Sequence, residues 1–180
     1  MRFLNALLWE SIQNTPVIVL FVFAVWHWTR RRKTRSMVCA IGGAVVGSLL
    51  IRFTEPAASG YHEPVEVTAV NAVSMSLLQF LFAVYLGTEA NWSNWRMDVF
   101  LGAGAGVALA VAQGLAAPDP PVIGILLHSL ALASAGALVL VGIRKLKGQD
   151  LTSALASAAL LAIVMTLFIS LIDYGYFLIW

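Results

Sequence analysis

The residues with the most chemical potential gather between Arg52 and Asn71, a short polar stretch between two long apolar runs. It carries three acids, Glu55, Glu63 and Glu66, together with Arg52 and His62. Carboxylates near an arginine can bind a charged solute, and a carboxylate or a histidine can also act as an acid or a base. This stretch is therefore the first candidate for a binding site.

A metal site is one alternative for the same stretch. His62 and Glu66 are four residues apart and could share one helix face as half of a metal site if the helix began early. Pro64 instead favours a helix that starts just after His62, because proline suits the first turn. Glu66 also replaces the second histidine of the HExxH motif. These residues are more typical of a solvated loop and helix cap, and the sequence identifies no metal or other cofactor.

The composition indicates what surrounds this stretch. Of the 180 residues, 60% are hydrophobic and 11% are charged, whereas about 25% are charged in a typical soluble domain. The mean hydropathy is +0.86. The net charge of +2 is too small to indicate nucleic-acid binding, and the single Cys39 excludes a disulfide within the chain. The chain is predicted to be an integral membrane protein surrounded by the lipid bilayer.

Apolar runs of about 20 residues, enough to cross the hydrocarbon core, recur along the chain. The second run is expected to end at Glu55-Pro56, since a residue before proline is disfavoured in a helix. For the first run, the alternative is a separate interfacial helix from Phe3 to Gln13. We predict an all-α fold, a polytopic bundle of six transmembrane helices in a single domain over residues 1–180. The helices are expected at about residues 6–28, 36–53, 65–87, 98–116, 122–143 and 151–177.

Small residues recur at steps of four within several predicted helices, a spacing that lets helix backbones approach closely. Gly43 and Gly47 lie in the second helix, and residues 154–162 repeat alanine in the sixth. The longest repeat lies in the fourth helix: Gly102, Gly106, Ala110 and Gly114. We predict that this stripe faces another helix.

Basic residues indicate the orientation. One cluster, Arg30 to Arg35, follows the first helix, and a second, Arg144 to Lys147, follows the fifth. An even number of crossings separates the clusters, so both can stay in the cytoplasm as the positive-inside rule requires. The prediction is a multi-pass protein of the cell membrane with both termini extracytoplasmic.

Five of the six helices then carry polar groups near their outer ends. A charge in the bilayer centre costs about 2.5 to 3.5 kcal/mol, so these groups are expected to converge on an interior polar cavity open to the outside. Arg52 is expected to pair with Glu55, Glu66 or Asp173, and Gln79, deeper in the third helix, with a neighbouring helix. The candidate ligand-binding residues are Glu10, Arg52, Glu55, Glu66, Asn71, His128 and Asp173.

These features favour a membrane-embedded protein that binds or transports a small-molecule solute. In size and helix count, the chain resembles the vitamin-capturing membrane subunits of energy-coupling factor transporters, which implies solute capture. One alternative is an accessory or scaffold subunit, whose small-residue stripes pack against a partner membrane protein or a second copy. The other is an intramembrane enzyme that uses Glu55, Glu66 or His128 as acid or base.

Overall fold

The structure is a computed structural model that describes the backbone of residues 2–59, 64–88, 94–116, 122–146 and 149–179. Side chains are described for residues 8–9, 11–54, 64–88, 94–116, 123, 125–146 and 149–167. The fold is all-α, as predicted. Its six helices are α1 (Arg2–Thr29), α2 (Lys33–Ser59), α3 (Val65–Thr88), α4 (Trp95–Ala116), α5 (Val122–Leu146) and α6 (Leu151–Ile179).

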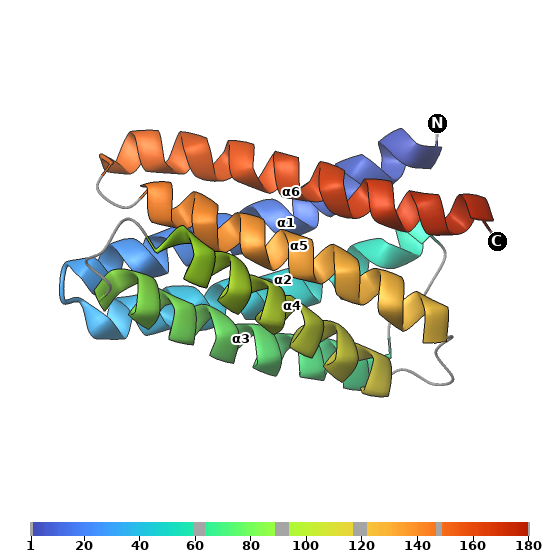
Figure 1. Ribbon diagram of the computed structural model, residues 1–180, viewed down its shortest axis with the longest axis horizontal. Coiled ribbons are helices and arrows are strands. Elements are labelled where there is room, and N and C mark those ends of the chain that lie inside the picture. Colours follow the sequence, from blue (N-terminus) through green and yellow to red (C-terminus); the bar gives the residue numbers. More distant parts are fainter. Residues whose placement is uncertain (1, 60–63, 89–93, 117–121, 147–148, 180) are drawn as a thin grey trace.

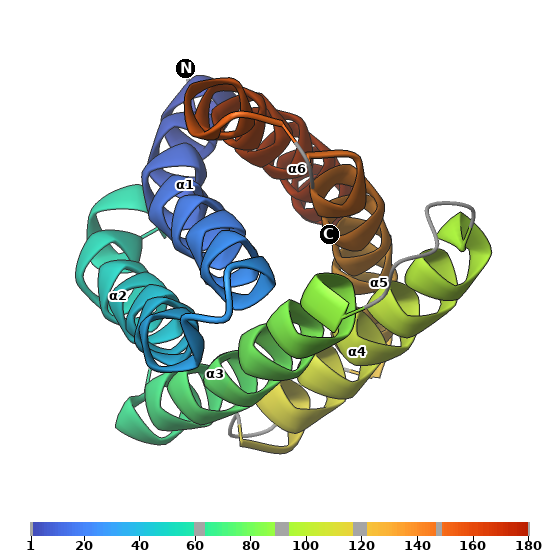
Figure 2. The same ribbon diagram turned by 90° about the vertical axis from the view of Figure 1, so that its left-hand side faces the viewer.

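The helices run up and down along one axis, and α1 begins at the end where α6 finishes (Figure 1). Each helix packs against the next, and α6 returns to α1, so the six form a ring (Figure 2). Five helices, α1 to α5, are long and apolar enough to cross a membrane. The described apolar part of α6 is Leu151–Leu167. The chain is therefore a multi-pass membrane protein.

Two helices extend through prolines. The prediction that Glu55-Pro56 ends the second helix is wrong, because α2 continues to Ser59. Similarly, α1 runs unbroken through Pro16, so residues 3–13 belong to the same helix as the first apolar run and do not form a separate one. Proline removes only one backbone donor, and in lipid a helix remains the best way to satisfy the other backbone groups.

The predicted glycine stripe of α4 packs against α5. A Cβ on Gly102 would overlap the carbonyl of Gly136, and one on Gly106 would overlap the carbonyl of Leu132. Farther along, Ala110 is buried, and a Cβ on Gly114 would lie 3.0 Å from a side-chain carbon of Ile125. The close approach predicted for this stripe is confirmed: at Gly102 and Gly106, the backbone of α4 meets the backbone of α5.

The glycines of α2 serve the same purpose against α1. A Cβ on Gly43 would lie 2.9 Å from Leu20 Cβ, and one on Gly47 would overlap the side chain of Val17. The alanines of α6 at 154, 158 and 162 are buried against the bundle. The small-residue spacings therefore predicted which helix faces pack together.

The turn from α1 to α2 is tight. Arg32 N–H donates to the His27 carbonyl over 3.0 Å, and Arg31 N–H donates to the Trp28 carbonyl over 2.9 Å. This is the Schellman pattern, which needs a left-handed residue, and Arg31 takes that position with φ of 60°. Exposed cations lie at this end of α1, α2, α4 and α5, so we call it the basic end: Arg30, Arg31, Arg32, Lys33, Arg35, Arg96 and Lys145.

Candidate functional site

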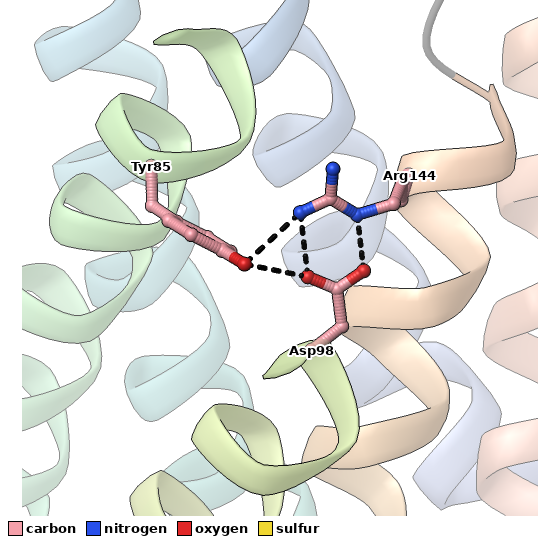
Figure 3. A network of polar contacts seen from close by, with 3 residues as sticks. All are labelled: Tyr85, Asp98 and Arg144. Carbon is pink, nitrogen blue, oxygen red and sulfur yellow. Dashed lines mark hydrogen bonds and ion pairs between the residues drawn. The ribbon is translucent and has the colours of Figure 1, made fainter. Parts of the chain in front are cut away.

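A buried ion pair joins α3, α4 and α5 at the basic end (Figure 3). Arg144 approaches Asp98 with two donors: Nε bonds to Oδ2, and Nη2 bonds to Oδ1 over 2.7 Å. Tyr85 completes the group, since its hydroxyl donates to Asp98 Oδ1 over 3.0 Å and accepts from Arg144 Nη2 over 3.1 Å. Asp98 is 0% exposed and Arg144 is 3% exposed. We call these three residues the charged network.

The positions of these residues on their helices explain why they meet. Asp98 lies in the first turn of α4 and Arg144 in the last turn of α5, where the helix dipoles favour an anion and a cation respectively. Because α4 and α5 are antiparallel neighbours, these two turns lie at the same height. Sequence reasoning assigned Arg144 to the cytoplasmic end but did not pair it with Asp98. Their positions in opposite terminal turns could have indicated the pair.

A second network joins the same three helices toward the opposite end. His128 Nε2 lies 2.7 Å from Gln113 Oε1, and Gln113 Nε2 donates to Asn71 Oδ1 over 2.6 Å. The glutamine oxygen accepts, so His128 donates from Nε2, which is the tautomer assigned by this pattern. Asn71 is 4% exposed. We call these residues the amide network.

The amide network brings together two of the predicted site residues, Asn71 and His128, through Gln113, which was not predicted. Arg52 has Nη1 3.5 Å from Thr68 Oγ1, and Glu66 is exposed. The predicted pairing of Arg52 with Glu55, Glu66 or Asp173 stays a prediction, and so does the polar outer cavity. The side chains of Glu10, Glu55 and Asp173 lie outside the described residues.

The proposed metal half-site also involves a residue outside the described part of the chain, His62. Among the described side chains, no three His, Cys, Asp or Glu residues lie close enough together to hold a metal ion.

Polar side chains of α1 bind its neighbours in the half of the bundle away from the basic end. Gln13 Nε2 donates to Thr54 Oγ1 of α2 over 2.7 Å, and Asn14 Nδ2 donates to Thr166 Oγ1 of α6 over 3.3 Å. Thr54 in turn donates to the carbonyl of Leu50. These bonds attach α1 to the helices on either side of it.

A cavity of about 140 Å³ lies inside the ring, bounded by α1, α3, α4, α5 and α6. Most of its wall is apolar, with Phe21, Phe82 and Met165 among the larger side chains. Two amide side chains, Asn14 and Gln79, also line it. None of the four described candidates from the sequence contributes to this wall, so the cavity is a separate site.

Gln79 is the unusual member of this wall. It is 4% exposed, and among the described residues its Oε1 has no hydrogen-bond partner. Gln79 was expected to bond to a neighbouring helix, and within the described part of the chain its oxygen does not. Gly43 makes room for the amide, since a Cβ there would lie 3.1 Å from Oε1. A buried amide oxygen without a partner costs about 1–3 kcal/mol and calls for an explanation such as a ligand.

The fold and the cavity define a class: a multi-pass helical membrane protein with an apolar internal cavity that contains a polar group. No protein-family model, curated protein or solved structure matches the chain.

Proposed function

We propose that this protein binds a small, mostly apolar molecule inside the membrane, with the central cavity as the binding site and Gln79 as its polar contact. The observation that carries the proposal is the buried Gln79 amide in the wall of the cavity, whose oxygen has no hydrogen-bond partner among the described residues. A bound hydroxyl or carbonyl group would bond to this amide. This keeps the solute-binding class predicted from the sequence and assigns it a site within the ring.

The volume and the wall define the ligand class. An apolar cavity of about 150 Å³ accommodates benzene, so 140 Å³ suits a molecule of about one ring. The Gln79 amide can accept a hydrogen bond through its oxygen and donate through its nitrogen. The ligand is therefore a single ring that carries a hydroxyl or carbonyl group.

The orientation and the transport step belong to the same proposal. The positive-inside rule supports the proposal that the basic end lies on the cytoplasmic side of the cell membrane and both termini outside. Release to either side would make the protein a transporter, whereas a partner subunit could use it as a binding component. No feature of the described residues favours the enzyme alternative.

The test compares phenol with toluene, which have similar shapes but differ in one hydroxyl. Purified protein in lipid nanodiscs should bind phenol more tightly, as measured by saturation-transfer NMR. Gln79→Leu should remove this preference. One hydrogen bond corresponds to a difference in affinity between phenol and toluene of up to about tenfold. The melting temperature of the variant should not fall, because the substitution also removes an unsatisfied buried group.

The matched control is Gln149→Leu, which changes an exposed glutamine at the start of α6. It should leave the preference for phenol intact. Ala135→Leu, which adds bulk to the α5 wall of the cavity, should abolish the binding of both probes. Equal phenol binding by the wild type and Gln79→Leu, or no binding by the wild type, would overturn the proposal.

A further inference from the structure

The contact between α3 and α4 differs from the rest of the ring. The face of α3 toward α4 carries Asn71, Met75, Leu78, Phe82 and Tyr85, at steps of four and three residues. The first and the last belong to the amide and charged networks. The middle three line the cavity. This face is thus held by polar bonds at both ends and is apolar between them.

The facing side of α4 has the same arrangement. Asp98 belongs to the charged network and Gln113 to the amide network, 15 residues away. At 1.5 Å per residue, the two networks are about 22 Å apart along the helix. Between them, Ala105 and Leu109 line the cavity opposite α3. The facing side chains that line the cavity in this interval are apolar.

This interval is also the loosest part of the ring. Of the consecutive helix pairs, α3 and α4 make the least extensive contact. Met75, Leu78, Phe82 and Ala105, on the α3 and α4 walls of the cavity, are half-buried. Because α4 packs closely against α5 through Gly102 and Gly106, it lies farther from α3 than from α5.

From this arrangement we infer that the ligand is a lipid-phase molecule whose ring lies in the cavity and whose apolar chain leaves between α3 and α4. The inference rests on the proposed function and adds the ligand class. The ligand's apolar chain in this interval would touch only apolar side chains and lipid hydrocarbon. It would therefore reach the cavity from the lipid without passing through water. A route along the bundle axis would instead pass the charged or the amide network, where polar groups would lose their partners.

The experiment uses two probes in nanodiscs: phenol, and a phenol with a para-dodecyl chain that ends in a diazirine. The alkylphenol should bind at the phenol site and, after irradiation, label exposed residues beside the α3–α4 contact. Leu81 and Ala108 are the expected targets, since each follows a cavity residue, Leu78 or Ala105, by three positions and is exposed. Mass spectrometry of peptides locates the label.

Two controls separate site-directed labelling from simple partition into lipid. Phenol at about ten times its dissociation constant should lower labelling roughly tenfold, because both probes occupy one site. Ala135→Leu, with its cavity wall filled, should lose the same labelling. Labelling that survives both controls would be non-specific and would overturn the inference.

The remaining outcomes separate the two proposals. Phenol binding with no competition from the alkylphenol, or with label on α1, α2 or α6, would overturn the lipid-phase ligand and leave the cavity as the site for a small solute. No binding of phenol would overturn both proposals.

Discussion

The charged network and the amide network join the same three helices at opposite ends, but with different chemistry. At the basic end, Asp98 and Arg144 form a fully buried ion pair with Tyr85. At the other end, neutral amides bond in a chain that ends at His128. The comparison shows that the contact among α3, α4 and α5 is stabilised at its two ends by interactions of unequal strength.

The two networks differ in strength because separating their members leaves different groups without partners. Separating a buried ion pair exposes two charges to a low-dielectric interior, which is strongly unfavourable. Neutral bonds between membrane helices contribute only about 0.6 kcal/mol on average, because the separated groups find other partners. The basic end should therefore stay closed, and the amide end should be the one that can open.

The largest expected effect comes from breaking the ion pair. Asp98→Ala leaves Arg144 buried without its anion, and should lower the free energy of unfolding by about 3–5 kcal/mol. Reversible unfolding of the purified protein in mixed micelles measures this change. The double variant Asp98→Ala with Arg144→Met should recover most of the loss, since no charge stays buried. A double variant as unstable as the single one would contradict the comparison.

The next effect concerns the packing between the networks. Gly106→Leu places a side chain where the Leu132 carbonyl lies, so α4 and α5 must separate, at a cost of about 1–3 kcal/mol or more. Val107→Leu is the matched control, because Val107 is exposed and only one residue away. Equal folded yields and melting temperatures for the two variants would show that the close helix contact does not position the networks.

A smaller effect is expected at the amide end. Gln113→Leu removes both bonds of the network and should cost about 1.2 kcal/mol, since each hydrogen bond between membrane helices contributes about 0.6 kcal/mol on average. Amide hydrogen exchange should rise more in the turns of α3 and α4 around Asn71 and Gln113 than near Asp98. A loss as large as that of Asp98→Ala would mean that the two ends are equally fixed.

The smallest effect concerns how the stability of the basic end depends on pH. The titrating group, Asp150, lies outside the membrane-spanning segments. Asp150 caps α6: Ser153 N–H donates to its Oδ1 over 3.0 Å, and the Ser153 hydroxyl donates to Oδ2 over 2.5 Å. These bonds hold the pKa of Asp150 below its ordinary value of 3.8. The stabilisation is therefore present above pH 3.8 and is lost as the pH falls through the lowered pKa.

Asp150→Asn keeps a capping oxygen but cannot titrate. The stability difference between this variant and the wild type should shrink below pH 3.8. A difference that stays constant to lower pH would show that the cap's charge does not contribute to the stability of this end.

The sequence predicted the helices and their close contacts because these depend on local patterns. Apolar length decides whether a segment spans the membrane, and the four-residue spacing of Gly102 and Gly106 decides which face packs closely. The end of α2 was missed because a local rule about Pro56 was outweighed by the need to satisfy backbone groups in lipid.

The site was harder to predict because it depends on which residues of different helices lie at the same height. Asn71 and His128 were predicted separately, but their link through Gln113 needs the relative positions of three helices. Gln79 was noted as a polar position, yet only packing shows that its oxygen lacks a partner among the described residues and that the side chain lines a cavity. The volume of the cavity depends on how side chains of different helices pack, and residue spacing within one helix does not predict it.

The positive charge of Arg31, the left-handed residue of the α1–α2 turn, responds to the membrane potential. Its backbone conformation costs about 1–2 kcal/mol, and glycine or asparagine would adopt it more easily. Moving one positive charge to the positive side of an energised membrane costs about 2.3 kcal/mol per 100 mV. In the proposed orientation and at 100 mV, a cation at position 31 therefore does more to keep this turn on the negative side than its conformation costs the fold.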